Sequence, residues 1–202
     1  MAKTGTPTLV ETHPFGNFIP KGAKCLVLGS FPTHQKNWRF NSFYPGRANF
    51  FWRMLSEIYA HPFKHITGEE ATKERLLLCH QKGIAISDTI YKCQRKIATS
   101  SKDSDLIVIE KMDILKLLKQ NPGIHTIILT GSSGPVSAHS VFYQHLAEHH
   151  IPFETTGTKP PVTGKFTYQK REIKIFTLYS TSGINIGRYA QAVAQYKAHL
   201  PL

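Results

Sequence analysis

The chain has 202 residues, 41% of them hydrophobic, which is typical of one globular domain with a sizeable core. Its apolar runs are far shorter than the roughly 20 residues of a membrane-spanning helix, and its first dozen residues lack the apolar stretch of a secretory signal. Twenty-five Lys and Arg against thirteen Asp and Glu leave a formal charge of +12. This excess predicts affinity for nucleic acid, anionic lipid or phosphorylated substrates, with an inert basic surface as the alternative.

The three cysteines, Cys25, Cys79 and Cys93, are an odd and widely scattered set. Such a set disfavours a disulfide framework and suits a reducing cytoplasm. Three thiolates are also too few to hold an iron–sulfur cluster. We therefore expect a cytoplasmic protein without a cofactor of that kind.

The chain begins with a segment rich in Thr, Pro and Gly, residues 1–23, which is predicted to wrap the surface with Phe15 and Phe18 as anchors. A short apolar run then predicts a buried strand over 24–29. Apolar residues at helical spacing predict a helix over 49–60.

Strands and helices alternate through the rest of the chain. The predicted elements are a helix at 69–82, a strand at 84–86, a polar basic loop at 92–105, a helix at 108–120, a strand at 125–130, a helix from 131 to about 149, a strand near 153, a surface loop at 159–164, a turn at 168–172, a strand at 173–178, a loop at 179–186 and a helix at 187–199. This order predicts a three-layer α/β/α fold with a central, mainly parallel four-stranded sheet. We find no repeat and no linker, so residues 1–202 are interpreted as a single domain.

Polar and aromatic residues follow three of these strands, at the edge where parallel strands end. The loops are 30–48 with Phe31, Phe43, Tyr44 and the adjoining Asn49; 87–104 with Asp88, Arg95, Lys96, Ser100 and Ser101; and 179–186 with Ser180-Thr-Ser-Gly-Ile-Asn185. Loops at this edge of an open α/β sheet converge on one site. Aromatic rings and an amide suit a flat ligand such as a nucleobase, and hydroxyls at a helix start suit phosphate oxygens.

The same loops carry three short motifs. They are Gly29-Ser30-Phe31-Pro32 with Phe43-Tyr44 and Asn49-Phe50-Phe51-Trp52; Gly83-Ile-Ala-Ile-Ser-Asp88 with Cys93-Gln-Arg95 and Asp103-Ser104; and Ser180-Thr181-Ser182 with Asn185. In this order they resemble the uracil-DNA glycosylase superfamily, and within it the hypoxanthine-DNA glycosylase-like branch. The resemblance spans roughly residues 25–188.

That resemblance implies a uracil-DNA glycosylase-like fold and an enzyme that flips a deaminated base, such as uracil, hypoxanthine or xanthine, out of DNA and hydrolyses its N-glycosidic bond. Asn49 corresponds to the catalytic Asn and would position water or the base. The implied base-binding residues are Gly29, Ser30, Phe31, Phe43, Tyr44 and Asp88, with Tyr44 or Phe31 stacking on the base. The implied DNA-backbone and wedge residues are Ser180, Thr181, Ser182, Ile184, Asn185 and Arg188, with Ile184 filling the vacated stack.

The implied partner is DNA containing a damaged or mismatched base. The resemblance implies no cofactor and no metal, a monomer, and a cytoplasmic location that would be nucleoid-associated in a bacterium.

The chain departs from the family pattern at three points. Phe31 stands where many superfamily members carry an Asp or Asn that activates water, the terminal motif lacks a His, and residues 45–48 read Pro-Gly-Arg-Ala. These departures keep a second hypothesis open: a catalytically weak or inactive relative that binds DNA through its basic face. A third is an α/β protein that acts on a free nucleotide.

Several of these residues also have plain structural interpretations. Asn49 is as well suited to capping the helix that follows it, because Asn is favoured at that position. Asp88 can bond backbone amides at a turn after its strand. His145 and His149 are four residues apart on a predicted helix, but no third ligand is identifiable, so we interpret them as part of a solvated face rather than a metal site.

Overall fold

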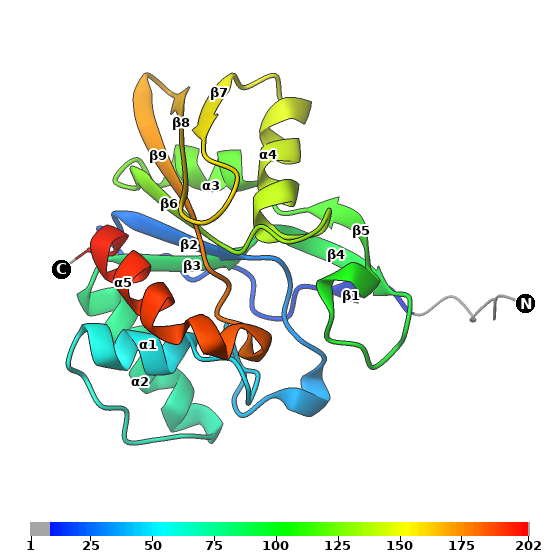
Figure 1. Cartoon of the computed structure of the whole chain (residues 1–202), viewed down its shortest axis with the longest axis vertical. Helices are drawn as coiled ribbons and strands as arrows, with labels where there is room; N and C mark the ends of the chain where they lie inside the picture. The colour runs from blue at the N-terminus through cyan, green and yellow to red at the C-terminus, as the bar shows by residue number, and fades with distance from the viewer. Residues whose placement is uncertain (1–8, 202) are drawn as a thin grey trace, which may run out of the picture.

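The computed structural model describes residues 9–201, which fold around a six-stranded sheet in the order β3-β2-β6-β9-β8-β7 (Figure 1). Its strands are β2 (Cys25–Gly29), β3 (Ile84–Asp88), β6 (Thr126–Thr130), β7 (Phe153–Thr156), β8 (Val162–Tyr168) and β9 (Arg171–Leu178). The strands β3, β2, β6 and β9 are parallel to one another. The strand β8 is antiparallel to β9, and β7 is antiparallel to β8. The prediction of a four-stranded sheet is therefore wrong in size: a hairpin extends the parallel part and makes the sheet mixed.

The extra strand β8 lies where the sequence predicts a surface loop and a turn. Its first residues follow Lys-Pro-Pro, and Gly164 interrupts its apolar pattern, which hides the strand from a composition-based prediction. Gly164 is needed there, because a Cβ would lie 2.5 Å from the Tyr143 hydroxyl and 2.8 Å from the Glu154 carbonyl oxygen. The predicted turn itself is present: Gln169 and Lys170 both have positive φ and join β8 to β9.

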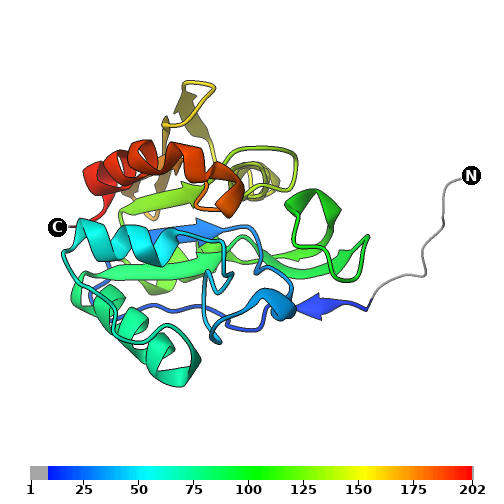
Figure 2. The same ribbon diagram turned by 60° about the horizontal axis from the view of Figure 1, so that its bottom comes forward.

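A second, three-stranded antiparallel sheet replaces the predicted loop at 92–105 and the first part of the predicted helix at 108–120. It consists of β1 (Glu11–Thr12), β4 (Ile90–Arg95) and β5 (Leu106–Lys111), in the order β1-β4-β5 (Figure 2). In β4 the inward residues Ile90, Cys93 and Arg95 are buried, and a register shift lies between Lys92 and Cys93. That irregularity and the charged residues obscure the alternation that would identify a strand.

Five helices cover the two faces of the large sheet within residues 9–201. They are α1 (Phe51–Ile58), α2 (Gly68–Gln81), α3 (Ile114–Gln120), α4 (Ala138–Glu148) and α5 (Tyr189–His199), with 3₁₀ turns η1 (Gln35–Asn37), η2 (Asp103–Asp105) and η3 (Gly183–Arg188). In Figure 1, α1, α2 and α5 lie on one side of the sheet, and α3 and α4 lie on the other. None of the helices in the described part of the chain is long and apolar enough to cross a membrane.

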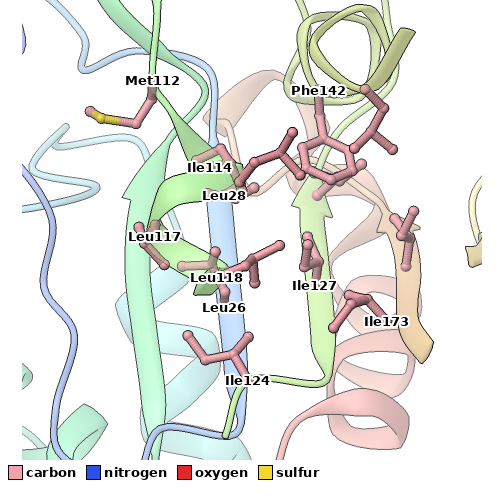
Figure 3. Close-up of a cluster of buried hydrophobic side chains, with 14 of the residues drawn as sticks. Leu26, Leu28, Met112, Ile114, Leu117, Leu118, Ile124, Ile127, Phe142 and Ile173 are labelled. Carbon is pink, nitrogen blue, oxygen red and sulfur yellow. The ribbon is translucent and has the colours of Figure 1, made fainter. Parts of the chain in front are cut away.

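Alternate residues of the parallel strands supply two separate cores. Leu26 and Leu28 of β2 face α3 and α4, where they join Leu117, Leu118 and Phe142 (Figure 3). Cys25 and Val27, which alternate with these leucines along β2, face the opposite side of the sheet and join a cluster with residues of α1, α2 and α5. Burial on both faces explains why this strand is a continuous apolar run.

All three cysteines are buried and free, as expected from their odd number. The N-terminal segment runs along the outer edge of β3, where Phe18 exchanges two backbone hydrogen bonds of 2.9 Å with Ile86. Phe15 is partly buried against the aromatic residues of the α1–α2 face. Residues 1–8 of the predicted wrapping segment lie outside the described residues.

Candidate functional site

The carboxyl ends of β2 and β3 form the floor of the candidate site. Gly29 and Asp88 are paired in register as the last residues of these two strands. A Cβ on Gly29 would lie 2.2 Å from Asp88 Oδ1 and 3.4 Å from the Tyr44 hydroxyl. Only glycine therefore leaves room for the Asp88 carboxylate, and this is the local reason for a glycine at the end of β2.

Asp88 is held by a histidine from the N-terminal segment. Nε2 of His13 lies 2.8 Å from Asp88 Oδ2, and the two side chains are 0% and 8% exposed. Nδ1 of His13 accepts a hydrogen bond from the Phe15 backbone N–H at 3.3 Å. Because Nδ1 is an acceptor, Nε2 carries the proton and donates it to Asp88. Sequence reasoning missed His13, and no local motif marks it.

Tyr44 lies beside this pair with its hydroxyl buried. Its ring packs on Phe51 of α1 with centroids 4.1 Å apart, and its backbone has a positive φ of 51°. By geometry the hydroxyl has no hydrogen-bond partner among residues 9–201. The Thr130 side chain is nearby and acts to lower the pKa of Tyr44. Burial and then the nearby Asp88 carboxylate hold the pKa of Tyr44 well above its usual value. An unpartnered hydroxyl at the floor is a ready hydrogen-bonding group for a ligand.

Asn49 lies at the meeting point of the first and last loops. The Phe50 backbone N–H donates to the Thr181 carbonyl at 2.9 Å, and a Cβ on Gly183 would lie 2.6 Å from Cβ of Ala48. The Asn49 Oδ1 accepts a 2.9 Å hydrogen bond from the Phe51 N–H, so its side chain satisfies the first backbone donor of α1 from the position before the N-cap Phe50. Its side-chain nitrogen has no hydrogen bond to the described residues, which leaves that donor free for a ligand.

The terminal motif surrounds the same point and is mostly accessible. Thr181 is buried, Ser180 and Asn185 are half-buried, and Ser182 is exposed. Ile184 is 91% exposed at the tip of η3. The exposed Arg188 guanidinium lies 4.9 Å from the centre of the Tyr179 ring. An isoleucine held out on a turn beside hydroxyl groups and an arginine is suited to contact with a nucleic acid.

Phe31 and Phe43 are more buried than a base-stacking residue of an open pocket. Phe43 is 3% exposed, its carbonyl accepts from the Trp52 indole at 2.9 Å, and its ring packs near His13. Phe31 is 9% exposed and joins a small cluster with Ile90 and Leu106. Their roles in base binding stay predictions.

Arg95 connects the three segments that border the site. Its guanidinium donates to both carboxylate oxygens of Glu11, at 2.7 and 3.2 Å, and to the carbonyls of Ser100 and Pro32, at 2.7 and 2.9 Å. The arginine side chain is only 2% exposed. It therefore fixes the strand β1, the loop after β2 and the tip of the β4–β5 hairpin to one another. Sequence reasoning placed Arg95 in a loop, whereas it ends a strand.

A second carboxyl group, that of Asp103 in η2, is brought to the Ser30 side chain. Burial raises the pKa of Asp103 to about 6, and the Asp88 carboxylate adds to the rise, while hydrogen bonding to Ser30 and the nearby Arg95 oppose it. Asp103 occurs in the second motif of the sequence, but nothing local indicated that it lies beside β2.

A hollow of about 810 Å³ lies between the loop after β2 and the start of α2. Its lining includes Trp38, Lys36 and Arg39, but neither Asn49 nor Asp88. The hollow is therefore not the space around Asn49 and Asp88.

Of the two histidines interpreted as a solvated face, His149, just after α4, is exposed, whereas His145 is not. His145 is buried, Nε2 has no partner among the described residues, and burial lowers the pKa of His145 to about 4. Within residues 9–201 no cluster of three His, Cys, Asp or Glu side chains is arranged to hold a metal ion. His145 is therefore neutral at neutral pH.

Replacing His13 with Phe is expected to lower the free energy of unfolding by about 1–3 kcal/mol, because the buried Asp88 carboxylate loses its donor. Phe keeps a ring among Phe15, Phe31 and Phe43, so packing is largely retained. Urea unfolding of the single variants and of His13→Phe with Asp88→Asn measures the coupling between the two positions. Additive effects in that cycle would contradict the pairing.

Comparison with protein-family models gives no match, and comparison with curated proteins gives none either. The structure resembles the solution NMR structure of a putative uracil DNA glycosylase from Methanosarcina acetivorans, with a TM-score of 0.59 and 17% identity over 94% of this chain and 98% of that one. At this identity the likeness concerns the fold. The chain thus shares its fold with that putative uracil DNA glycosylase, as predicted, whereas membership of the superfamily and of its hypoxanthine branch stays a prediction.

Proposed function

We propose that this protein is a monofunctional DNA glycosylase, acting as one domain, that flips a deaminated base from DNA and hydrolyses its N-glycosidic bond. The observation that carries the proposal is the junction of Asn49 with the terminal motif, made by the Phe50–Thr181 hydrogen bond and the close approach of Gly183 to Ala48. It puts a free amide donor, an exposed wedge-like isoleucine and a hydroxyl-rich loop at one edge of the sheet. The similar fold of the Methanosarcina acetivorans protein supports the same reading.

The proposed roles follow from this arrangement. Asn49 would position the attacking water or the departing base through its free side-chain nitrogen. The unpartnered Tyr44 hydroxyl and the Asp88 carboxylate would meet the polar edge of uracil, hypoxanthine or xanthine. Ser180 and Ser182 would hold the flanking phosphates while Ile184 enters the gap in the base stack. The formal charge of +12 favours association with a duplex.

The test is incubation of the protein with duplexes that each contain one uracil, hypoxanthine or xanthine, followed by alkaline cleavage of abasic sites. We expect abasic product from at least one lesion, and a fall of about 10²–10³-fold with Asn49→Ala, a loss typical of one transition-state donor. The matched control is Asn49→Ser, which keeps a capping oxygen for α1. Asn49→Ala is expected to lose about 1 kcal/mol of stability and Asn49→Ser much less, whereas both should lose activity.

A different pattern would favour the alternative of an inactive DNA-binding relative. The capping bond of Asn49 and the buried Phe31 are the observations on its side. Tight binding to duplex DNA that weakens steeply with salt, without abasic product from any lesion, would support it. Equal turnover by the Ser variant and the wild type would show that Asn49 acts only as a cap.

A further inference from the structure

The β4–β5 hairpin reaches the loop after β2 and places a carboxyl group there. The Ser101 hydroxyl accepts hydrogen bonds from the Asn37 side chain at 2.9 Å and from the His34 backbone N–H at 3.3 Å. Arg95, the last residue of β4 before the hairpin loop, donates to the Pro32 carbonyl at 2.9 Å. The turn η2, two residues beyond Ser101, is thereby held against the end of β2, where the Asp103 carboxyl meets the Ser30 hydroxyl.

The same loop links this position to Asn49. Gly46 lies between Thr33 and Asn49, because a Cβ on it would lie 3.2 Å from the Thr33 side chain and 3.8 Å from that of Asn49. The Thr33 hydroxyl is in turn 3.5 Å from the Asn37 side-chain nitrogen that binds Ser101. The hairpin tip and the start of α1 are therefore connected through Gly46, Thr33 and Asn37 of the loop after β2.

Two carboxyl groups lie near the ends of β2 and β3, and they are not equivalent. Asp88 gives Oδ2 to His13 and has Oδ1 packed against the backbone of Gly29. Asp103 has the Ser30 hydroxyl as its hydrogen-bond partner, and the charged groups that face it are Asp88 from β3 and Arg95 from β4. Arg95 is itself paired with Glu11 of β1. Asp103 is therefore the carboxyl that remains available for a proton from water.

We propose that Asp103 is the general base of the hydrolysis, supplying the carboxylate that the sequence lacks at Phe31. This inference rests on the proposed glycosylase function. Water attacks C1′ of the flipped nucleotide as the C1′–N bond breaks, and the bonding electron pair leaves with the base. The water proton passes to the Asp103 carboxylate and from there to solvent or to the departing base, which leaves an abasic sugar and the free base.

The electrostatic surroundings suit that role. A pKa of about 6 keeps Asp103 ionised at neutral pH and makes it a stronger base than a solvated carboxylate. Because the pKa in the folded state lies above the ordinary value of 3.8, the ionised group destabilises the fold, and this effect grows as pH rises from about 4 through 6. Replacing Asp103 with Asn should therefore leave the protein at least as stable at pH 8.

The experiment measures single-turnover base release by wild type and Asp103→Asn between pH 5 and 9, on the lesion that the wild type cleaves. We expect wild-type rates to rise about tenfold per pH unit below 6 and then level off, and the variant to be slower by about 10²–10⁴-fold with no such rise. Asp105→Asn is the matched control in the same turn. Its carboxylate accepts from Ser100 at 2.5 Å, a bond an amide oxygen can keep, so its pH profile should match wild type.

The outcomes separate this inference from the function on which it rests. Abasic product from wild type, with Asp103→Asn keeping both rate and pH profile, overturns the role of Asp103 and leaves the glycosylase proposal standing. Absence of product from every lesion overturns both. Loss of activity in Asp103→Asn together with a lower unfolding midpoint at pH 8 indicates a structural role and also overturns the inference.

Discussion

Replacing Gly29 with Ala should abolish base excision and lower the free energy of unfolding by about 1–3 kcal/mol, the usual range for overpacking a buried position. The new Cβ would lie 2.2 Å from Asp88 Oδ1, and Asp88 cannot yield without breaking its bond to His13. Both the floor of the site and the edge of the sheet would be displaced. Urea unfolding and the lesion assay measure the two effects.

Two further variants distinguish this clash from a general effect of adding a methyl group. Gly187→Ala adds a Cβ where nothing lies within 4 Å, so its stability should change by less than about 1 kcal/mol. The double variant Gly29→Ala with Asp88→Ala removes the clashing carboxylate and should regain stability without regaining activity. A stable, active Gly29→Ala protein would show that the Asp88 carboxylate is not fixed as described.

The second large effect is expected from Arg95→Met, which should lower the free energy of unfolding by about 2–3 kcal/mol through the lost hydrogen bonds of a buried charged donor. The substitution leaves Glu11 and two carbonyls without the donor that joins them. We also expect faster amide hydrogen exchange in residues 30–37 and 96–105, because their connection to β1 is lost. Activity should fall with the loosening of these loops around the site.

The matched control lies on the same strand. Lys92 pairs with Glu110 at 2.6 Å, but both side chains are more than a third exposed, so Lys92→Met should change stability by about 1 kcal/mol or less. Arg95→Lys keeps the charge but cannot serve three segments at once, and it should fall between wild type and Arg95→Met. Equal effects of Arg95→Met and Lys92→Met would refute the connecting role of Arg95.

The parallel part of the sheet is predictable because its strands are buried on both faces and read as unbroken apolar runs, such as Cys25–Leu28. The positions of Asn49 and of the terminal motif at one edge follow from the same strand order, since parallel strands end on one side. The β4–β5 sheet was not predictable, because Arg95 and Lys92 interrupt its alternation and β5 carries exposed isoleucines at 107 and 109. Its strand character comes from pairing partners elsewhere in the chain.

What the sequence determined by itself was the class of fold, the basic charge and the three motifs, because each depends on residues close together in the chain. The tertiary structure alone decided which groups share the floor of the site. His13 reaches Asp88 across 75 positions, and Glu11 reaches Arg95 across 84. No local periodicity can encode such pairs, since they exist only once the N-terminal segment and the hairpin have packed against the end of the sheet. For the same reason the sequence shows that position 31 carries no carboxylate, whereas only the folded structure shows that the carboxyl of Asp103 lies beside Ser30.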